Sequence, residues 1–157
     1  MNTISVVLPV MSAADDNKRL VSRALEEIYA KGDLDLADEL IGPDYEGHEP
    51  AHPELPIGPE SVKRTVRSLH STFAELRFDV EDEIAEGDKV VQLVTMSGRH
   101  TGPLMGHEAT GKPFAVRHIY IWRIADGKIA EHWGSRNDLG MLGQLGLFPI
   151  AEEREGA

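Results

Sequence analysis

Cysteine is absent from the 157 residues of this chain. Without thiols there is no disulfide framework, no cysteine nucleophile and no thiolate metal site. Basic residues are also scarce, since 16 lysines and arginines stand against 27 aspartates and glutamates, a formal net charge of −11. Because nucleic acids and anionic membrane surfaces are bound by clustered Lys and Arg, this balance argues against both partners. A ligand of this protein is expected to be neutral or to be held by local groups.

Long apolar runs are missing as well. Residues 1–11 are apolar, but they contain Pro9 and lack a basic start, so we expect neither a signal peptide nor a membrane span. A flexible or loosely docked arm is the better interpretation. We expect residues 12–150 to form one domain, which is long enough to bury a core without metals or disulfides. Residues 151–157 are expected to be an acidic tail, and the protein is expected to be cytoplasmic.

Two segments resemble catalytic motifs but fail in their context. His48–His52 reads H-E-P-A-H, yet the zinc signature works only on a helix, and Pro50 and Pro53 interrupt one here. Gly106–Lys112 resembles the start of a phosphate-binding loop, but Pro113 replaces the required Ser or Thr and a strand pattern follows. A G-x-S-x-G elbow is also absent from the sequence. We therefore predict no metal and no cofactor.

Apolar spacing is helical in the first part of the chain and alternating in the second. It predicts helices over residues 12–30, 33–42 and 60–75, with residues 43–58 as a loop. Strands are predicted from residue 76 and over residues 89–100, followed by a hairpin. Helices first and antiparallel strands second are typical of an α+β domain. We expect a curved sheet that wraps over the helices, leaves one open mouth and offers its outer face to a partner subunit.

The hairpin within Gly111–Gly146 is the most informative segment, and its Asp126-Gly127 turn suits a two-residue loop. Alternation puts one set of side chains of its first strand on a single face. That inward set is Phe114, Val116, His118, Tyr120 and Trp122. In the second strand the inward residues are expected to be Ala130, His132 and Gly134. An aromatic face that carries titratable imidazoles suits the wall of an apolar cavity.

The run E-x-W-G-x-x-x-D-L-G-M-L-x-Q-L-G from Glu131, behind R-I-A-D-G-K-I, resembles the SnoaL-like polyketide cyclases. Matching segments lie upstream at Gly58–Lys63 (G-P-E-S-V-K), Thr72–Asp82 (T-F-A-E-L-R-F-D-V-E-D) and Thr101–Pro113 (T-G-P-L-M-G…T-G-K-P). The resemblance covers about residues 15–148 and implies the cone-shaped α+β fold of the nuclear-transport-factor-two-like superfamily. It also implies a homodimer. Because this superfamily hosts cyclases, isomerases, dehydratases, epoxide hydrolases and binders, it implies the reaction less firmly.

In the founding cyclases of that family, an aspartate just after the E-x-W-like stretch acts as general acid and base in an aldol closure. Alignment residue by residue places this aspartate at Gly134. The cavity histidine of the family falls at Tyr120, with His118 two residues earlier on the same face. Glycine cannot move a proton, so the family mechanism does not carry over directly.

Four residues are the candidates for catalysis. We expect His118 to act as general acid or base, with His132 in support, because an imidazole with a pKa near neutrality suits proton transfer. The alternative for each is a satisfied core histidine. Tyr120, between them, can donate to a developing enolate oxygen. Asp138 either caps the last helix, as Asn137 also can, or acts as a base or orients a neighbour.

Substrate contact is expected from the apolar wall and from one cation near it. These residues are Met96, Phe114, Val116, Trp122 and Arg136. For Trp122 a place in the core is the alternative, and for Arg136 an ion pair with Asp138 or Glu131. Four other histidines, His48, His52, His100 and His107, are expected in loops and mostly in solvent.

These observations favour a cofactor-free cyclase or isomerase that acts on a polyketide- or terpenoid-like molecule. Proton transfer and the shape of the cavity would both contribute to catalysis. One alternative is a non-catalytic binding or accessory protein of the same fold, for which Gly134 would mark lost chemistry. The other is an epoxide or ester hydrolase, which needs a carboxylate aimed into the cavity, and Asp138 is the available one.

Overall fold

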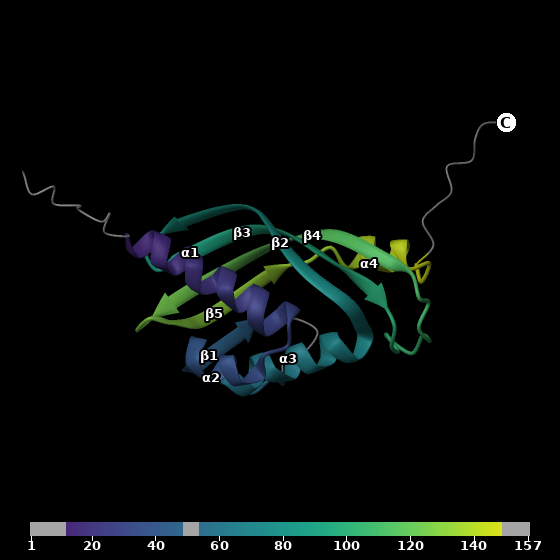
Figure 1. Ribbon diagram of the computed structural model, residues 1–157, viewed down its shortest axis with the longest axis horizontal. Helices are drawn as coiled ribbons and strands as arrows, with labels where there is room; N and C mark the ends of the chain where they lie inside the picture. Colours follow the sequence, from purple (N-terminus) through teal and green to yellow (C-terminus); the bar gives the residue numbers. More distant parts are fainter. Residues whose placement is uncertain (1–11, 49–53, 149–157) are drawn as a thin grey trace, which may run out of the picture.

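The computed structural model describes residues 12–48 and 54–148. In chain order the elements (Figure 1) are α1 (Ala13–Arg23), the π-helix η1 (Ala24–Ala30), α2 (Leu34–Leu40), β1 (Ile41–His48), α3 (Pro59–Thr72), β2 (Phe73–Glu86), β3 (Lys89–His100), β4 (Pro113–Ala125), β5 (Lys128–Ser135) and α4 (Asp138–Gln144). The predicted arm at residues 1–11, the tail at 151–157 and His52 lie outside the described residues. None of the helices in the two described ranges is long and apolar enough to cross a membrane.

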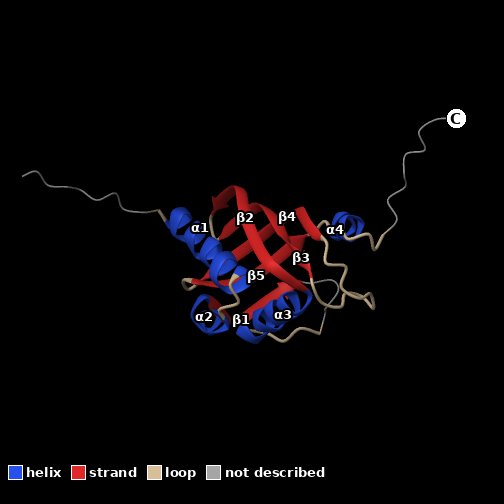
Figure 2. Ribbon diagram, turned by 45° about the vertical axis from the view of Figure 1, so that its right-hand side comes forward, coloured by secondary structure: helices blue, strands red, loops and turns tan. Residues whose placement is uncertain are grey.

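The five strands form one mixed sheet in the order β1-β5-β4-β3-β2. β1 runs parallel to β5, and every other pair of neighbours is antiparallel. The sheet curves around α1, α2 and α3, while α4 lies at the far end beside β4 (Figures 1 and 2). The core is formed between these helices and the inner face of the sheet. The predicted α+β class, with a curved mixed sheet over N-terminal helices, is confirmed. The internal cavity stays a prediction.

The predicted loop over residues 43–58 is wrong in its first part, because Ile41–His48 is a strand. β1 pairs with β5 only, so it forms an edge of the sheet, where a proline such as Pro43 is tolerated. The register shifts between Ile41 and Glu46, around that proline. Tyr45 is buried inside the same stretch. Proline and glycine made this segment look like a loop, and the parallel partner that orders it lies more than 80 residues away.

The first predicted helix has nearly the expected bounds but changes form within its length. Ser12 caps α1 by accepting from the backbone N–H of Asp15, and from Ala24 the helix widens into η1. Such π-segments are rare and often occur at functional sites. Here η1 brings the Tyr29 ring edge-on against Phe78 and Trp122, with centroids 6.1 and 6.2 Å away. The π-helix thus packs directly behind the aromatic face of the hairpin.

The hairpin has the predicted turn and inward face. Asp126 and Gly127 have φ of 52° and 71°, the pair of positive values that a type I′ turn requires. All five residues predicted inward on β4 are buried. On β5 one prediction is wrong: a bulge at Ala130 makes Glu131 pair with Arg123 but Ile129 with Ile124, so the fully buried Ile129 takes the inward place. His132 remains inward and buried, as predicted.

Candidate functional site

The candidate catalytic residues of the hairpin form one aromatic cluster on the inner face of the sheet. Trp122 lies directly opposite His132, and Tyr120 directly opposite Gly134. The Tyr120 ring lies 5.7 Å from that of His118 and 5.1 Å from that of His132, centroid to centroid. Tyr120 therefore stands between the two imidazoles. The predicted diagonal contact between them is wrong, because His132 lies opposite Trp122, four residues along β4 from His118. His132 packs most closely on Trp122, at 4.2 Å.

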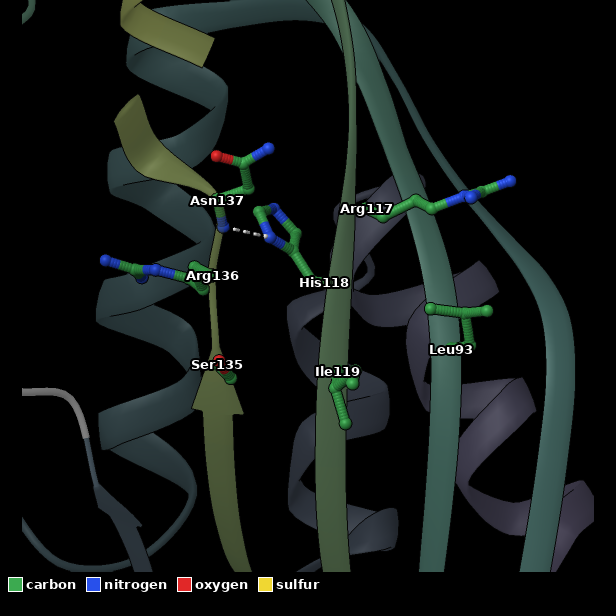
Figure 3. Close-up of a pocket in the computed structure, with 7 residues that line it drawn as sticks. All are labelled: Leu93, Arg117, His118, Ile119, Ser135, Arg136 and Asn137. Atoms are coloured by element: carbon green, nitrogen blue, oxygen red, sulfur yellow. Dashed lines mark hydrogen bonds between the residues drawn. The ribbon is translucent and has the colours of Figure 1, made fainter. Parts of the chain in front are cut away.

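His118 is held by the chain that leaves the sheet after β5. Its Nδ1 accepts a hydrogen bond from the backbone N–H of Asn137, at 3.1 Å (Figure 3). Burial lowers the pKa of His118 below its ordinary value. The Asp138 carboxylate opposes this shift, and the Arg136 guanidinium adds to it. The imidazole is therefore neutral around pH 7.

His132 is the more strongly perturbed imidazole. Burial, together with the positive charge of Arg136 and that of His48 when protonated, lowers the pKa of His132 to about 3. The predicted pKa near neutrality is thus wrong for this residue. A neutral imidazole with so low a pKa is a weak base, although it can still exchange hydrogen bonds.

Arg136 and Asp138 form an ion pair, with 3.1 Å between a guanidinium nitrogen and Oδ2. This is one of the two pairings expected for Arg136. Asp138 is not the cap of α4, because Oδ1 of Asn137 accepts from the backbone N–H of Gly140 at 2.9 Å. Asp138 instead contributes its charge to the environment of His118.

The resemblance places the family aspartate at Gly134, and the structure shows what a side chain there would meet. A Cβ built on Gly134 would lie 3.5 Å from the Tyr120 ring and 3.6 Å from Cε1 of His132, which is ordinary van der Waals contact. A carboxylate at this position would therefore lie among the candidate catalytic residues. The alignment and the geometry point to the same place.

A groove of about 310 Å³ adjoins the cluster where β5 ends and the chain turns toward α4. It is lined by Leu93, Arg117, His118, Ile119, Ser135, Arg136 and Asn137 (Figure 3). Arg117 and His118 point to opposite sides of β4, and His118 is directed toward Asn137 (Figure 3). Two predicted site residues, His118 and Arg136, thus lie together in one groove.

The predicted apolar contacts are all buried on the inner face. Met96 and Val116 are directly opposite each other on β3 and β4, and the Phe114 ring packs on Phe73 at 4.9 Å. Trp122 is 0% exposed and donates from Nε1 to Oε1 of Gln92 at 3.0 Å. That places Trp122 in the core, the alternative weighed for it. Whether any of these side chains touches a ligand stays a prediction.

Sequence reasoning missed Gln92 and misplaced His100. Gln92 is fully buried and donates to Ser22 of α1 and to Glu83 of β2, both at 3.1 Å. His100 is also fully buried rather than in solvent, and its Nδ1 accepts from the backbone N–H of Thr110. The available signal was alternation along β3, which puts both residues on the inner face.

The residues most able to hold a metal lie on the outer face of the sheet. Ligand atoms of Glu46, His48 and Glu131 lie within 4.8 Å of one another. Glu131 is already engaged, because it contacts Nε2 of His48 at 2.9 Å and Nε of Arg123 at 2.6 Å. The His48 ring also stacks on Trp133 at 4.9 Å. We interpret this set as an ion-pair network. His48 ends β1 and does not lie on a helix, so the H-E-x-x-H pattern has no helical start.

Comparison with known proteins agrees with this geometry. The model of the SnoaL-like polyketide cyclase family matches residues 19–145. The aklanonic acid methyl ester cyclase DnrD of Streptomyces peucetius is 37% identical over 127 residues, which cover 79% of this chain and 87% of that protein. The nogalonic acid methyl ester cyclase of Streptomyces nogalater is 34% identical over 119 residues, 75% of this chain and 89% of that protein. The solved structure of TsrD from Streptomyces laurentii superposes with a TM-score of 0.78 at 33% identity, over 88% of this chain and 100% of TsrD.

Proposed function

This chain belongs to the SnoaL-like polyketide cyclase family, and from that membership we propose that it closes a ring in a polyketide ester. The substrate class follows from two relatives, which are cyclases of aklanonic and nogalonic acid methyl esters. The observation that carries the proposal is the buried row of His118, Tyr120 and His132 in an aromatic wall. It combines hydrogen-bonding groups with an apolar surface, as an enclosed site for a flat, oxygen-rich substrate needs.

The proposed reaction is an intramolecular aldol closure, in which protons are only moved. A carbon next to two carbonyl groups loses a proton to solvent water, and the resulting enolate forms a carbon–carbon bond with a second carbonyl. The alkoxide formed there takes a proton back. Hydrogen-bond donors placed where negative charge develops stabilise such a step most in a dry site. Tyr120 and His118 are the donors we propose for this task.

The missing aspartate shifts the work from proton transfer to orientation. Gly134 offers no carboxylate, and His132 is a weak base because its pKa is about 3. A carbon between two carbonyls is already acidic, so folding the chain into the reactive shape can account for much of the rate. We propose that the inner wall, with Phe114, Val116 and Met96, provides this templating.

The test is turnover of aklanonic acid methyl ester and of nogalonic acid methyl ester by the purified protein. We expect ring-closed product by chromatography and mass spectrometry, without change in mass. His118→Phe should lower the rate about 100-fold, the usual cost of one oxyanion donor. Lys89→Met, on the far end of β3, is the matched control and should keep the rate. Wild-type protein that yields no product from either ester would contradict the proposal for this substrate class.

The second candidate is a binding protein, and the uncharged imidazoles beside Gly134 favour it. It predicts that the esters bind without turnover. Gly134→Asp separates the two candidates, since a Cβ at this position makes only ordinary van der Waals contact with Tyr120 and His132. A gain in rate from a measurable starting level supports the cyclase. A gain from zero supports the binder. An ester or epoxide hydrolase is disfavoured, because Asp138 is paired with Arg136.

We also propose a cytoplasmic homodimer that is formed through the outer face of the sheet. One row of paired residues crosses all five strands on that face: Ile84, Val91, Ile121, Trp133 and His48. Ile84 is 65% exposed, and Ile119, beside the row, is 48% exposed. Ion pairs such as Arg117–Glu81 and Arg123–Glu131 border the row. An apolar patch with a polar rim is the usual composition of a subunit interface.

A further inference from the structure

We propose that Asn137 is a positioning residue whose backbone N–H holds His118 in the tautomer with its hydrogen on Nε2. In that form His118 serves the substrate as a hydrogen-bond donor to an oxygen and not as a base. The assignment of the tautomer stands on geometry alone. Its use in ring closure rests on the proposed function.

The tautomer follows from the chemistry of the contact. A backbone N–H can only donate, so Nδ1 of His118, 3.1 Å from the Asn137 nitrogen, must be the acceptor. A neutral imidazole has one nitrogen with a free lone pair and one with hydrogen. Since Asn137 occupies the lone pair on Nδ1, the hydrogen is on Nε2. A base would need that same lone pair for the substrate.

The charged form of His118 is disfavoured by the same contact. An imidazolium carries hydrogen on both nitrogens, so Nδ1–H would face the N–H of Asn137 across 3.1 Å. The charged groups that act on His118, Arg136 and Asp138, are paired with each other. Burial of the ring and the lowered pKa point the same way. The geometry and the burial of the ring therefore both favour the neutral form of His118.

In the proposed role, Nε2 of His118 is the atom that meets the ligand. Within the described part of the chain no hydrogen bond reaches Nε2 of His118, while Nδ1 is fully used. His118 is also among the residues that line the groove at the end of β5, together with the outward-facing Ile119 and its partner Ser135. The ligand that fits an N–H donor here is an acceptor oxygen, the carbonyl, enolate or alkoxide oxygen of a polyketide. His118 keeps its hydrogen throughout the reaction, and the proton removed from carbon passes through solvent water to the alkoxide oxygen.

Asn137 is fixed by the end of β5 before it and by the start of α4 after it, so its backbone N–H has a defined position. β5 pairs with β4 as far as Ser135 opposite Ile119, and then the chain leaves the sheet. The Asn137 side chain caps α4 through the N–H of Gly140, while its backbone reaches back to His118. The start of the last helix thereby fixes the orientation of the imidazole.

The direct test is nitrogen NMR of ¹⁵N-histidine-labelled protein, in which the two ring nitrogens of each tautomer give distinct shifts. We expect the Nε2–H pattern for His118 at pH 7 in the full chain. Asn137→Ala removes the cap but keeps the backbone N–H, so the pattern should persist. Asn137→Pro removes the N–H and should release a mixture of tautomers. An Nδ1–H or imidazolium pattern in the wild type would overturn the assignment, whether or not the proline variant folds.

Rates test the role of the donor. A glutamine side chain can offer an N–H near Nε2 but cannot act as a base. His118→Gln should therefore lose less than about 10-fold and His118→Phe about 100-fold on an ester that the wild type cyclises. Equal losses in both variants would show that His118 acts as a base. Without wild-type turnover the proposed function fails, while the NMR spectrum still decides the tautomer.

Discussion

At the scale of single residues, the two imidazoles of the site differ in what keeps them neutral. His118 is neutral because Asn137 and burial disfavour its charged form. His132 is neutral because it is buried near positive charge, and its pKa of about 3 lies far below the 6.5 of an exposed histidine. A proton taken up by His132 must therefore cost stability.

We predict that His132 makes the protein less stable in mild acid. Between about pH 6 and about pH 4 the folded state leaves His132 neutral, while the unfolded chain binds a proton there. The free energy of unfolding should therefore fall as the pH falls, by about 1.4 kcal/mol per pH unit from this group. Urea unfolding at several pH values gives the change of the unfolding free energy with pH. In His132→Phe this change should correspond to about one proton fewer than in the wild type. The non-titrating neighbour variant Tyr120→Phe is the control, and a His132→Phe slope equal to the wild type would contradict the prediction.

The sequence predicts the site residues that lie within strands, where side chains alternate between two faces, but not the contacts made after a strand ends. The alternation of side chains along a strand predicts that His118 and Tyr120 lie on one face, and their burial in the structure confirms it. The contact between His118 and Asn137 depends on the path taken after β5 ends, which no local pattern records. The cap of α4 stayed open between Asn137 and Asp138 in the sequence, because both satisfy the capping rule, and the structure shows Asn137.

At the scale of elements, buried polar bonds join three parts of the fold. Gln92 on β3 accepts from Trp122 on β4 and donates to Ser22 on α1. The contacts among β3, β4 and α1 therefore depend on this one side chain, which is fully buried. This network holds the C-terminal end of α1 against the sheet behind the aromatic cluster.

We predict that Gln92→Met lowers the free energy of unfolding by about 1–3 kcal/mol, because the Trp122 N–H would be left unpaired in the core. Chemical denaturation at pH 7 measures the loss. Lys89→Met, at the exposed start of the same strand, should change the stability little. In the double variant with Trp122→Phe the loss should be less than additive, since the unpaired donor is gone. Additive losses would show that the Trp122–Gln92 bond contributes nothing.

Elements were predictable where local and distant preferences agree. β3 has the predicted bounds, and the hairpin turn has the predicted residues, because alternation and turn chemistry act locally. β1 was missed because its partner is distant and Pro43 argues for a loop. Helix α3 ends at Thr72, before the predicted end, because Phe73 already pairs with His100. The bulge at Ala130 likewise has no signature in composition.

At the scale of the whole molecule, the outer face of the sheet is the large surface that the helices leave uncovered (Figures 1 and 2). A row of paired side chains crosses it, from Ile84 on β2 to His48 on β1. In a twofold dimer the same patch meets itself, so its ion-pair rim would surround two copies of the row. Burial of exposed apolar side chains would supply the driving force.

We therefore predict a mass of twice the 17.3 kDa chain by light scattering coupled to gel filtration. Ile119→Glu should shift the protein toward monomer, because it places two like charges in the centre of a twofold contact. Met105→Glu is the matched control, since Met105 is 77% exposed on a loop away from the sheet and should leave the mass unchanged. A wild-type monomer at all concentrations would refute the dimer. A dimer that tolerates Ile119→Glu would place the interface on another face.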